Sequence, residues 1–166
     1  VLFDLDQESP DKRRVQFDER SSWFYEAIAM SVGMQGRIVG FGQVYLEASK
    51  DARGQWLDGG KSYRMRVPAG APVKQFWSIT LYDNLSRGPL ITPQGAADLS
   101  SRKPDLVTNA DGSVDVIFGP LKPAGATNWI QTTPGKGWFA YFRFYGPTEA
   151  YFAKTWQLND ITLIQP

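Results

Sequence analysis

The stretch "VKQFWSITLYDN", residues 73–84, has the alternation of a β-strand, and it carries aromatic side chains at both parities. Successive strand side chains point to opposite sides, so residues of one parity share a face. The first face is apolar and is predicted to point to a core: Val73, Trp77, Ile79 and Leu81. The second face mixes rings with hydroxyls: Phe76, Ser78, Thr80 and Tyr82. One apolar face is enough to attach a strand to a core, so the second face needs its own explanation.

A later stretch, "GWFAYFRFYGP" at residues 137–147, repeats this two-faced arrangement. Its predicted core parity is Trp138, Ala140, Phe142 and Phe144, and its other parity is Phe139, Tyr141, Arg143 and Tyr145. The second parity could form the wall of a ligand site, where Arg143 would bind a carboxylate or phosphate. It could instead be buried against another layer of protein, because Tyr and Arg are also common in interfaces. The pattern favours burial.

The remaining sequence predicts further short strands separated by Pro- and Gly-rich joints. "YRMRV" at 63–67 alternates cleanly, and strands are also expected within 37–49 and at 161–164. "LVTNADGSVDVIF" at 106–118 places two apolar runs around Asn109–Ser113, which predicts a tight hairpin with Gly112 at positive φ. No helices recur between these strands, as a parallel α/β sheet would require. We therefore expect a mainly β fold, an antiparallel β-sandwich or barrel.

The N-terminal part differs in character from the rest of the chain. Residues 1–20 are polar and charge-rich, which predicts an extended arm. Within "SSWFYEAIAMSVGMQG", apolar residues recur with the period of a helix face and predict one amphipathic helix at 21–34: Trp23, Ala27, Met30 and Met34. Residues 21–166 are interpreted as a single β-sandwich domain with this leading helix.

Composition narrows the possible functions. The chain has 166 residues, a net charge of +1 and mixed charge signs, which argues against nucleic-acid binding, and no apolar run is long enough for a membrane span. It contains no His and no Cys, which excludes Ser-His-Asp and thiol catalysis within the chain. The commonest transition-metal ligands are thus missing, and we expect neither a metal site nor a cofactor.

Two carboxylate patterns are weaker candidates. "NADGSVD" at 109–115 resembles a calcium loop in its alternate polar residues, but Gly112 stands at the fourth position rather than the sixth, so a plain turn is favoured. Asp83, Asp98, Asp111 and Asp115 could include an acid/base pair. Each lies at a predicted strand end, where Asp is a common turn residue, so a structural role is favoured for all of them.

The order of these pieces resembles the bacterial family known as domain of unknown function 1214. The resemblance rests on "YLEASKDARGQWLDGGKSYRMRVP", "PVKQFWSITLYD", "LVTNADGSVDVIFG", "NWI" and "FRFYGP", and it covers about residues 45–164. It implies a jelly-roll β-sandwich that forms the C-terminal half of a longer protein, behind domain of unknown function 1254. It also implies export, and so a periplasmic or cell-envelope setting, whereas the Cys-free composition suits an exported and a cytosolic protein alike. It implies no reaction.

These observations predict an accessory or binding domain of an envelope protein that acts through assembly or ligand binding. The candidate binding or interface residues are Phe76, Tyr82, Asp83, Tyr141, Arg143 and Tyr145. The expected partners are a second copy, the missing upstream domain, or a small molecule or glycan. An alternative is an enzyme domain, a hydrolase or lyase acting on a glycan, lipid or aromatic acid through Asp, Tyr and Arg chemistry. A purely structural subunit of a homo-oligomer is a third possibility.

Overall fold

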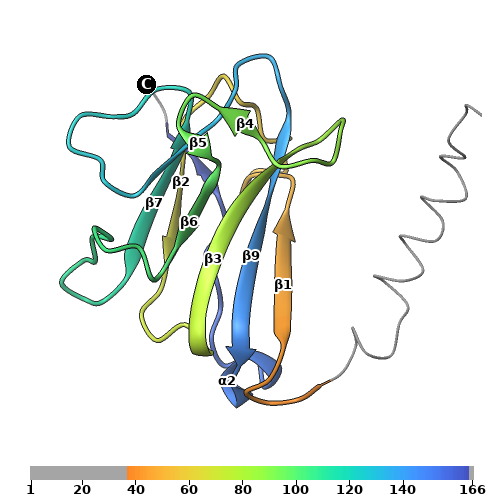
Figure 1. Ribbon diagram of the computed structural model, residues 1–166, viewed down its shortest axis with the longest axis vertical. Coiled ribbons are helices and arrows are strands. Elements are labelled where there is room, and N and C mark those ends of the chain that lie inside the picture. Colours follow the sequence, from red (N-terminus) through yellow and green to blue (C-terminus); the bar gives the residue numbers. More distant parts are fainter. Residues whose placement is uncertain (1–36, 165–166) are drawn as a thin grey trace, which may run out of the picture. The chain divides into compact units, whose positions relative to one another are not determined.

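The fold is mainly β and contains two four-stranded sheets in the computed structural model, which describes residues 37–164 (Figure 1). The first sheet has the order β1 (Gln43–Ala48), β9 (Trp138–Pro147), β3 (Val73–Asp83) and β6 (Asp98–Ser100). The second has the order β10 (Thr162–Leu163), β2 (Tyr63–Val67), β7 (Val114–Gly119) and β8 (Trp129–Gln131). The described fold also contains a small separate hairpin, formed by β4 (Ile91–Thr92) and β5 (Gly95–Ala96). It contains one short helix, α2 (Glu149–Phe152). The predicted arm and helix at 1–34 lie outside the described residues.

The pairing is antiparallel throughout the first sheet, as expected, but not in the second. There β7 and β8 run parallel, so the expectation of purely antiparallel pairing is wrong at this position. The connection between them, residues 120–128, carries the chain from the end of β7 back to the level of Ile117, where β8 begins beside it. The Trp129 indole fixes this crossover by donating a hydrogen bond of 3.0 Å to the carbonyl oxygen of Gly119.

The core is formed by the predicted faces of the strands. Trp77, Ile79 and Leu81 are buried in β3, and the corresponding residues of β9, Phe142 and Phe144, are buried beside them. In the second sheet, β2 alternates buried and exposed residues as its sequence predicts. The two sheets share one core, because the Trp138 ring lies 5.8 Å from that of Tyr63 and 5.2 Å from that of Phe118.

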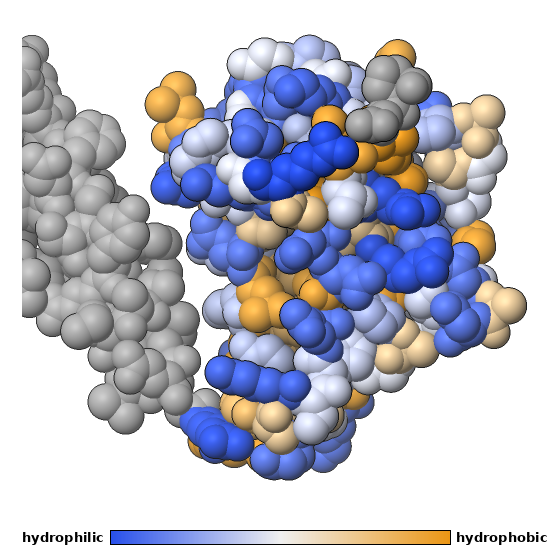
Figure 2. Space-filling view, turned by 180° about the vertical axis from the view of Figure 1, so that it is seen from behind, coloured by the Kyte–Doolittle hydropathy of each residue, from blue (hydrophilic) through white to orange (hydrophobic). Residues whose placement is uncertain are grey.

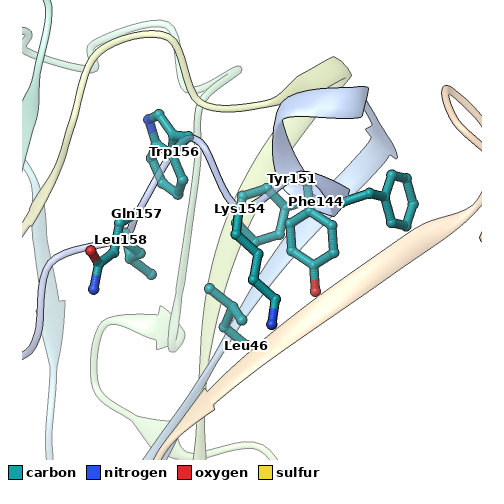
Figure 3. A pocket seen from close by; sticks show the side chains of 8 residues that line it. Leu46, Phe144, Tyr151, Lys154, Trp156, Gln157 and Leu158 are labelled. Carbon is teal, nitrogen blue, oxygen red and sulfur yellow. The ribbon is translucent and has the colours of Figure 1, made fainter.

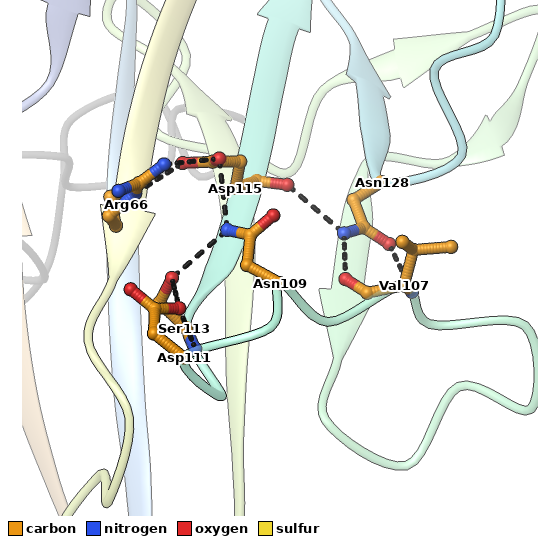
Figure 4. Close-up of polar contacts among 7 residues, drawn as sticks. All are labelled: Arg66, Val107, Asn109, Asp111, Ser113, Asp115 and Asn128. Carbon is orange, nitrogen blue, oxygen red and sulfur yellow. Dashed lines mark hydrogen bonds and ion pairs between the residues drawn. The ribbon is translucent and has the colours of Figure 1, made fainter.

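The turn at 109–113 is confirmed, but its first arm is not a strand. Gly112 has φ of 78°, and the Asn109 amide donates to the Ser113 carbonyl at 2.8 Å. Val107 is instead held by the Asn128 side chain, which accepts from its amide at 3.0 Å and donates to its carbonyl at 2.7 Å (Figure 4). Because Asn128 occupies these backbone groups, residues 106–108 do not pair with β7, which pairs with β2 and β8.

The surface seen from behind is largely hydrophilic, and its hydrophobic areas are small and separate (Figure 2). Within residues 37–164, no helix has the length and apolar character that crossing a bilayer requires.

Candidate functional site

The side of the first sheet that points away from the core carries most of the predicted site residues, and we call it the aromatic–arginine face. Strand register places Tyr145 opposite Phe76, and Tyr82 opposite Phe139. It also aligns β1 with β9, so that Tyr45 lies opposite Arg143. The strand residues that define the face are Tyr45, Phe76, Thr80, Tyr82, Phe139, Tyr141, Arg143 and Tyr145.

The rings of this face pack against one another across the strands. Phe76 and Tyr145 are stacked with centroids 4.0 Å apart and an interplanar angle of 12°. Tyr82 and Phe139 are stacked at 5.3 Å, and Tyr141 meets both edge-on at 5.4 and 5.5 Å. Offset and edge-to-face pairs of this kind are favourable for aromatic quadrupoles. The rings thus form an ordered surface.

Arg143 lies at the centre of the rings and is partly buried. Its guanidinium donates to the Thr80 hydroxyl at 2.9 Å and to the Tyr82 hydroxyl. The guanidinium carbon is 5.5–5.6 Å from the ring centroids of Tyr45, Tyr82 and Tyr141, within the range of cation–π attraction. An arginine has five N–H donors, and two are used here. No described residue gives Arg143 a carboxylate partner, so its charge and spare donors can receive an anion.

Two more arginines cover the ends of the face from loops. The Arg87 guanidinium lies 5.0 Å from the Phe139 ring centroid, and that of Arg102 lies 4.1 Å from Phe76. Neither forms an ion pair with another residue of the 37–164 segment. Arg102, Arg143 and Arg87 therefore add positive charge at three places along a ring-lined surface.

The phenol of Tyr141 remains neutral on this surface. Burial, followed by the nearby Glu47 carboxylate, raises the pKa of Tyr141 above its ordinary value. Glu47 is the residue opposite Tyr141 in β1. The tyrosine therefore contributes ring area and a hydroxyl rather than a charge.

Asp83 is separated from the other five predicted residues. It ends β3 on the core parity and is buried, and its carboxylate accepts the amides of Leu85 at 2.8 Å and Ser86 at 2.9 Å. Lys136 adds an ion pair at 3.0 Å. The Ser86 amide, Lys136 and the Leu85 amide lower the pKa of Asp83 to about 2. These contacts make it the anchor of a turn.

The structure adds three residues to the face that sequence reasoning missed: Tyr45, Arg87 and Arg102. For Tyr45 a signal exists, since β1 alternates apolar Val44, Leu46 and Ala48 with polar neighbours. The two arginines lie in loops, where no periodicity indicates which way a side chain points.

The polar turn at 109–115 is internally satisfied (Figure 4). Arg66 forms a bidentate contact with Asp115 at 2.9 and 2.8 Å, and Asn109 donates to the same carboxylate at 3.0 Å. The Asp111 carboxylate accepts both the amide and the hydroxyl of Ser113. These hydrogen bonds lower the pKa of both carboxyls. Over the described part of the chain, no group of three or more His, Cys, Asp or Glu is placed to hold a metal ion.

The described residues thus define a mainly β domain whose outer sheet face is lined by rings and arginines. Residues 42–149 match the family described as "Protein of unknown function (DUF1214)", and the chain belongs to this family. No curated protein matched the chain.

Two solved structures resemble the chain. The VPA0106 protein from Vibrio parahaemolyticus has a TM-score of 0.68 and 25% identity, over 89% of this chain and 35% of that one. An uncharacterised protein from Burkholderia cenocepacia has a TM-score of 0.48 and 16% identity, over 98% of this chain and 47% of that one. This chain therefore spans about a third of the Vibrio protein and about half of the Burkholderia protein.

Proposed function

We propose that the chain is a non-catalytic binding domain, and that the aromatic–arginine face is its contact surface for a protein partner that presents carboxylates. The observation that carries the proposal is Arg143, which is partly buried among three rings with spare donors and no carboxylate partner in residues 37–164. A partner carboxylate would meet a pre-positioned donor group, at little cost in side-chain ordering.

The composition of the face supports a protein partner. Interface cores are enriched in Tyr, Phe and Arg, and Tyr and Arg are among the commonest hot-spot residues. Four tyrosines, two phenylalanines and three arginines gather here, several in direct ring contact. The greater length of the Vibrio protein is consistent with further polypeptide beside this domain.

A second copy of the chain, bound through the same face in a symmetric dimer, fits this face less well than an acidic partner does. In a twofold interface the same patch meets itself, so the central Arg143 would come close to its own copy. Like charges juxtaposed in an interface oppose binding. We therefore assign the face to a different, acidic surface, such as one supplied by an upstream domain.

The proposal also covers the cellular location of the protein and the type of its β fold. We propose that the protein is exported to the periplasm or cell envelope, as the resemblance described above implies, and that its two sheets form a jelly-roll β-sandwich. The shared core of the two sheets supports the sandwich. Osmotic-shock fractionation of the source bacterium tests the location, with a periplasmic result expected; retention in the cytosolic fraction would remove this part of the proposal.

Site-specific photo-crosslinking tests the proposed contact surface. A benzoylphenylalanine at Tyr45, which is 39% exposed on the face, is compared with one at Arg64, which is exposed on the second sheet. In cells expressing the natural protein, we expect one adduct of defined mass from position 45 and none from position 64. The cross-linked peptide should contain Asp or Glu close to the attachment point.

Arg143→Gln decides whether the adduct depends on the guanidinium. The variant should lose the adduct while the melting temperature of the purified chain shows that it remains folded. Arg64→Gln is the matched control and should leave the adduct unchanged. An adduct that survives Arg143→Gln, or that is a second copy of this chain, would contradict the proposal.

A further inference from the structure

A separate cavity lies on the core side of the first sheet, at its β1 edge (Figure 3). It has a volume of about 590 Å3. The residues that line it are mostly apolar: Leu46, Phe144, Tyr151, Phe152, Lys154, Trp156, Gln157 and Leu158. Leu46 opposes Phe142 in the strand register, so it points to the core side, yet it remains 38% exposed. The inner face of β1 is thus left partly uncovered by the second sheet.

The far wall of the cavity is held firmly in place. Tyr151 and Trp156 pack on the Phe144 ring at centroid distances of 5.0 and 5.7 Å. The Trp156 indole also donates to the carbonyl oxygen of Ala69 at 3.0 Å. Two rings and a hydrogen bond thus hold this wall in place. Pre-formed apolar sites of 300–1,000 Å3 are typical of small-molecule binding.

Among the described residues that line the cavity, Lys154 alone carries a charge. It follows α2 with φ of 57°, a left-handed conformation in which helix ends usually place Gly. A side chain at such an angle is strained, and strain of this kind concentrates at functional positions. No described residue forms an ion pair or hydrogen bond with its ammonium, and none of the eight lining residues is acidic.

We propose that this cavity binds a small amphipathic carboxylate, with its apolar body against Leu46, Phe144 and Trp156 and its carboxylate at Lys154. An apolar wall beside one unpartnered cation complements a ligand with one anionic end. The volume is large enough to admit an alkyl or aromatic acid of about ten carbons. This site is distinct from the aromatic–arginine face, which is on the opposite side of the same sheet.

NMR titration of the whole 166-residue chain with decanoate, below its micelle concentration, tests the proposal. We expect saturable shifts at the amides of Leu46, Tyr151 and Leu158 and at the Trp156 indole N–H. Decanol should bind several-fold more weakly, and decyltrimethylammonium more weakly still. Absence of saturable shifts at millimolar decanoate, or equal affinity for all three probes, would overturn the proposal.

Single substitutions test separately the charged end of the cavity, at Lys154, and its apolar wall, at Leu46. Lys154→Met keeps the apolar stem and should weaken decanoate binding about threefold to fivefold, as the loss of an exposed ion pair does, without changing decanol binding. Lys122→Met, an exposed loop lysine away from the cavity, should change neither. Leu46→Trp should obstruct the apolar wall at Leu46 and weaken binding of both decanoate and decanol. Equal decanoate affinity in Lys154→Met and the natural chain would contradict the assigned role of Lys154.

The same variants also test two other possible occupants of the cavity, a membrane surface and a second copy of the chain. Phosphatidylglycerol vesicles present an anionic amphiphile within a bilayer, and we expect no co-sedimentation. Vesicle binding that Lys154→Met removes would assign the cavity to a membrane surface. A dimer in sedimentation that Leu46→Trp dissociates would assign it to a second copy. Either outcome overturns the small-carboxylate proposal.

Discussion

Arg143 and Tyr82, on the adjacent strands β9 and β3, form both a hydrogen bond and a ring contact. The guanidinium donates to the Tyr82 hydroxyl, and its carbon is 5.6 Å from the centroid of the same ring. The tyrosine therefore holds the arginine in position while leaving other donors available. Pre-positioning of this kind lowers the ordering cost of binding.

Tyr82→Phe tests that contact by removing the acceptor and keeping the ring. A hydrogen bond to a charged, partly buried group is lost, and we expect the free energy of unfolding in urea to fall by about 1–2 kcal/mol. Tyr45→Phe is the matched control, since its hydroxyl makes only an exposed 3.4 Å contact with Gln43. It should change stability by less than about 0.5 kcal/mol. Equal losses in the two variants would show that the Tyr82 hydroxyl has no special role.

Trp77→Ala tests the assignment of the core face. Trp77 is 6% exposed and stacks on Phe142 at 5.3 Å. Removing a buried ring leaves a cavity, so we expect a loss of about 3–5 kcal/mol. Trp56, which is 63% exposed, is the control, and Trp56→Ala should cost less than about 1 kcal/mol. An unchanged melting temperature in Trp77→Ala would show that the core face and the outer face of the strand are assigned the wrong way round.

Gly112→Val tests the turn at 109–113. The position has φ of 78°, and a Cβ there would lie 3.2 Å from the Cβ of Ala69. A β-branched residue is strained in the left-handed region, so we expect a loss of about 2–3 kcal/mol in thermal unfolding. Gly112→Asn should cost clearly less, because Asn tolerates this conformation. If Asn and Val are equally destabilising, the cause is the contact with Ala69 and not the backbone angle.

Asp83 makes folding stability depend on pH in the acid range. Its pKa is lowered from 3.8 to about 2 by the Ser86 amide, Lys136 and the Leu85 amide. A carboxyl whose folded pKa is depressed contributes stability above its unfolded pKa and loses it as pH falls. The contribution should be full above about pH 5 and gone below about pH 1.

The urea midpoint measured from pH 5 to pH 2 checks this dependence. The natural chain should lose more stability over that range than Asp83→Asn, whose side chain does not titrate. Asp160→Asn, at an exposed position, should follow the natural chain. Parallel curves for Asp83→Asn and the natural chain would show that the turn contacts do not favour the ionised form.

The alternation of apolar and polar residues predicted the strands, but it did not predict which strand pairs with β7 or where the loop side chains point. The parity of β3 and β9 was enough to assign Trp77 and Phe144 to the core, because a strand has a fixed period of two. The parallel partner of β7 depends on a crossover held by Trp129 and Asn128, contacts between residues distant in sequence. Arg87 and Arg102 reach the site from loops, whose side-chain directions follow no period.

The candidate site residues could likewise be predicted where they lie in strands, and not where they lie in turns or loops. Five of the six predicted residues lie on one face because they share strand parity, whereas Asp83 has the other parity and anchors a turn. The cavity beside Leu46 had no sequence signal, since its far wall comes from residues 151–158, which follow the last long strand.

Hydroxyl-radical footprinting measures whether a partner covers the aromatic–arginine face in the cell. The purified chain is compared with the protein in intact cells of its source, and the readout is the oxidation rate of Tyr45, Tyr141 and Tyr145. Trp56, exposed elsewhere in the fold, serves as the internal reference. We expect the three tyrosines to react in the purified chain and to be protected severalfold in the cell, relative to Trp56. Equal reactivity of these tyrosines in both settings would show that no partner covers the aromatic–arginine face.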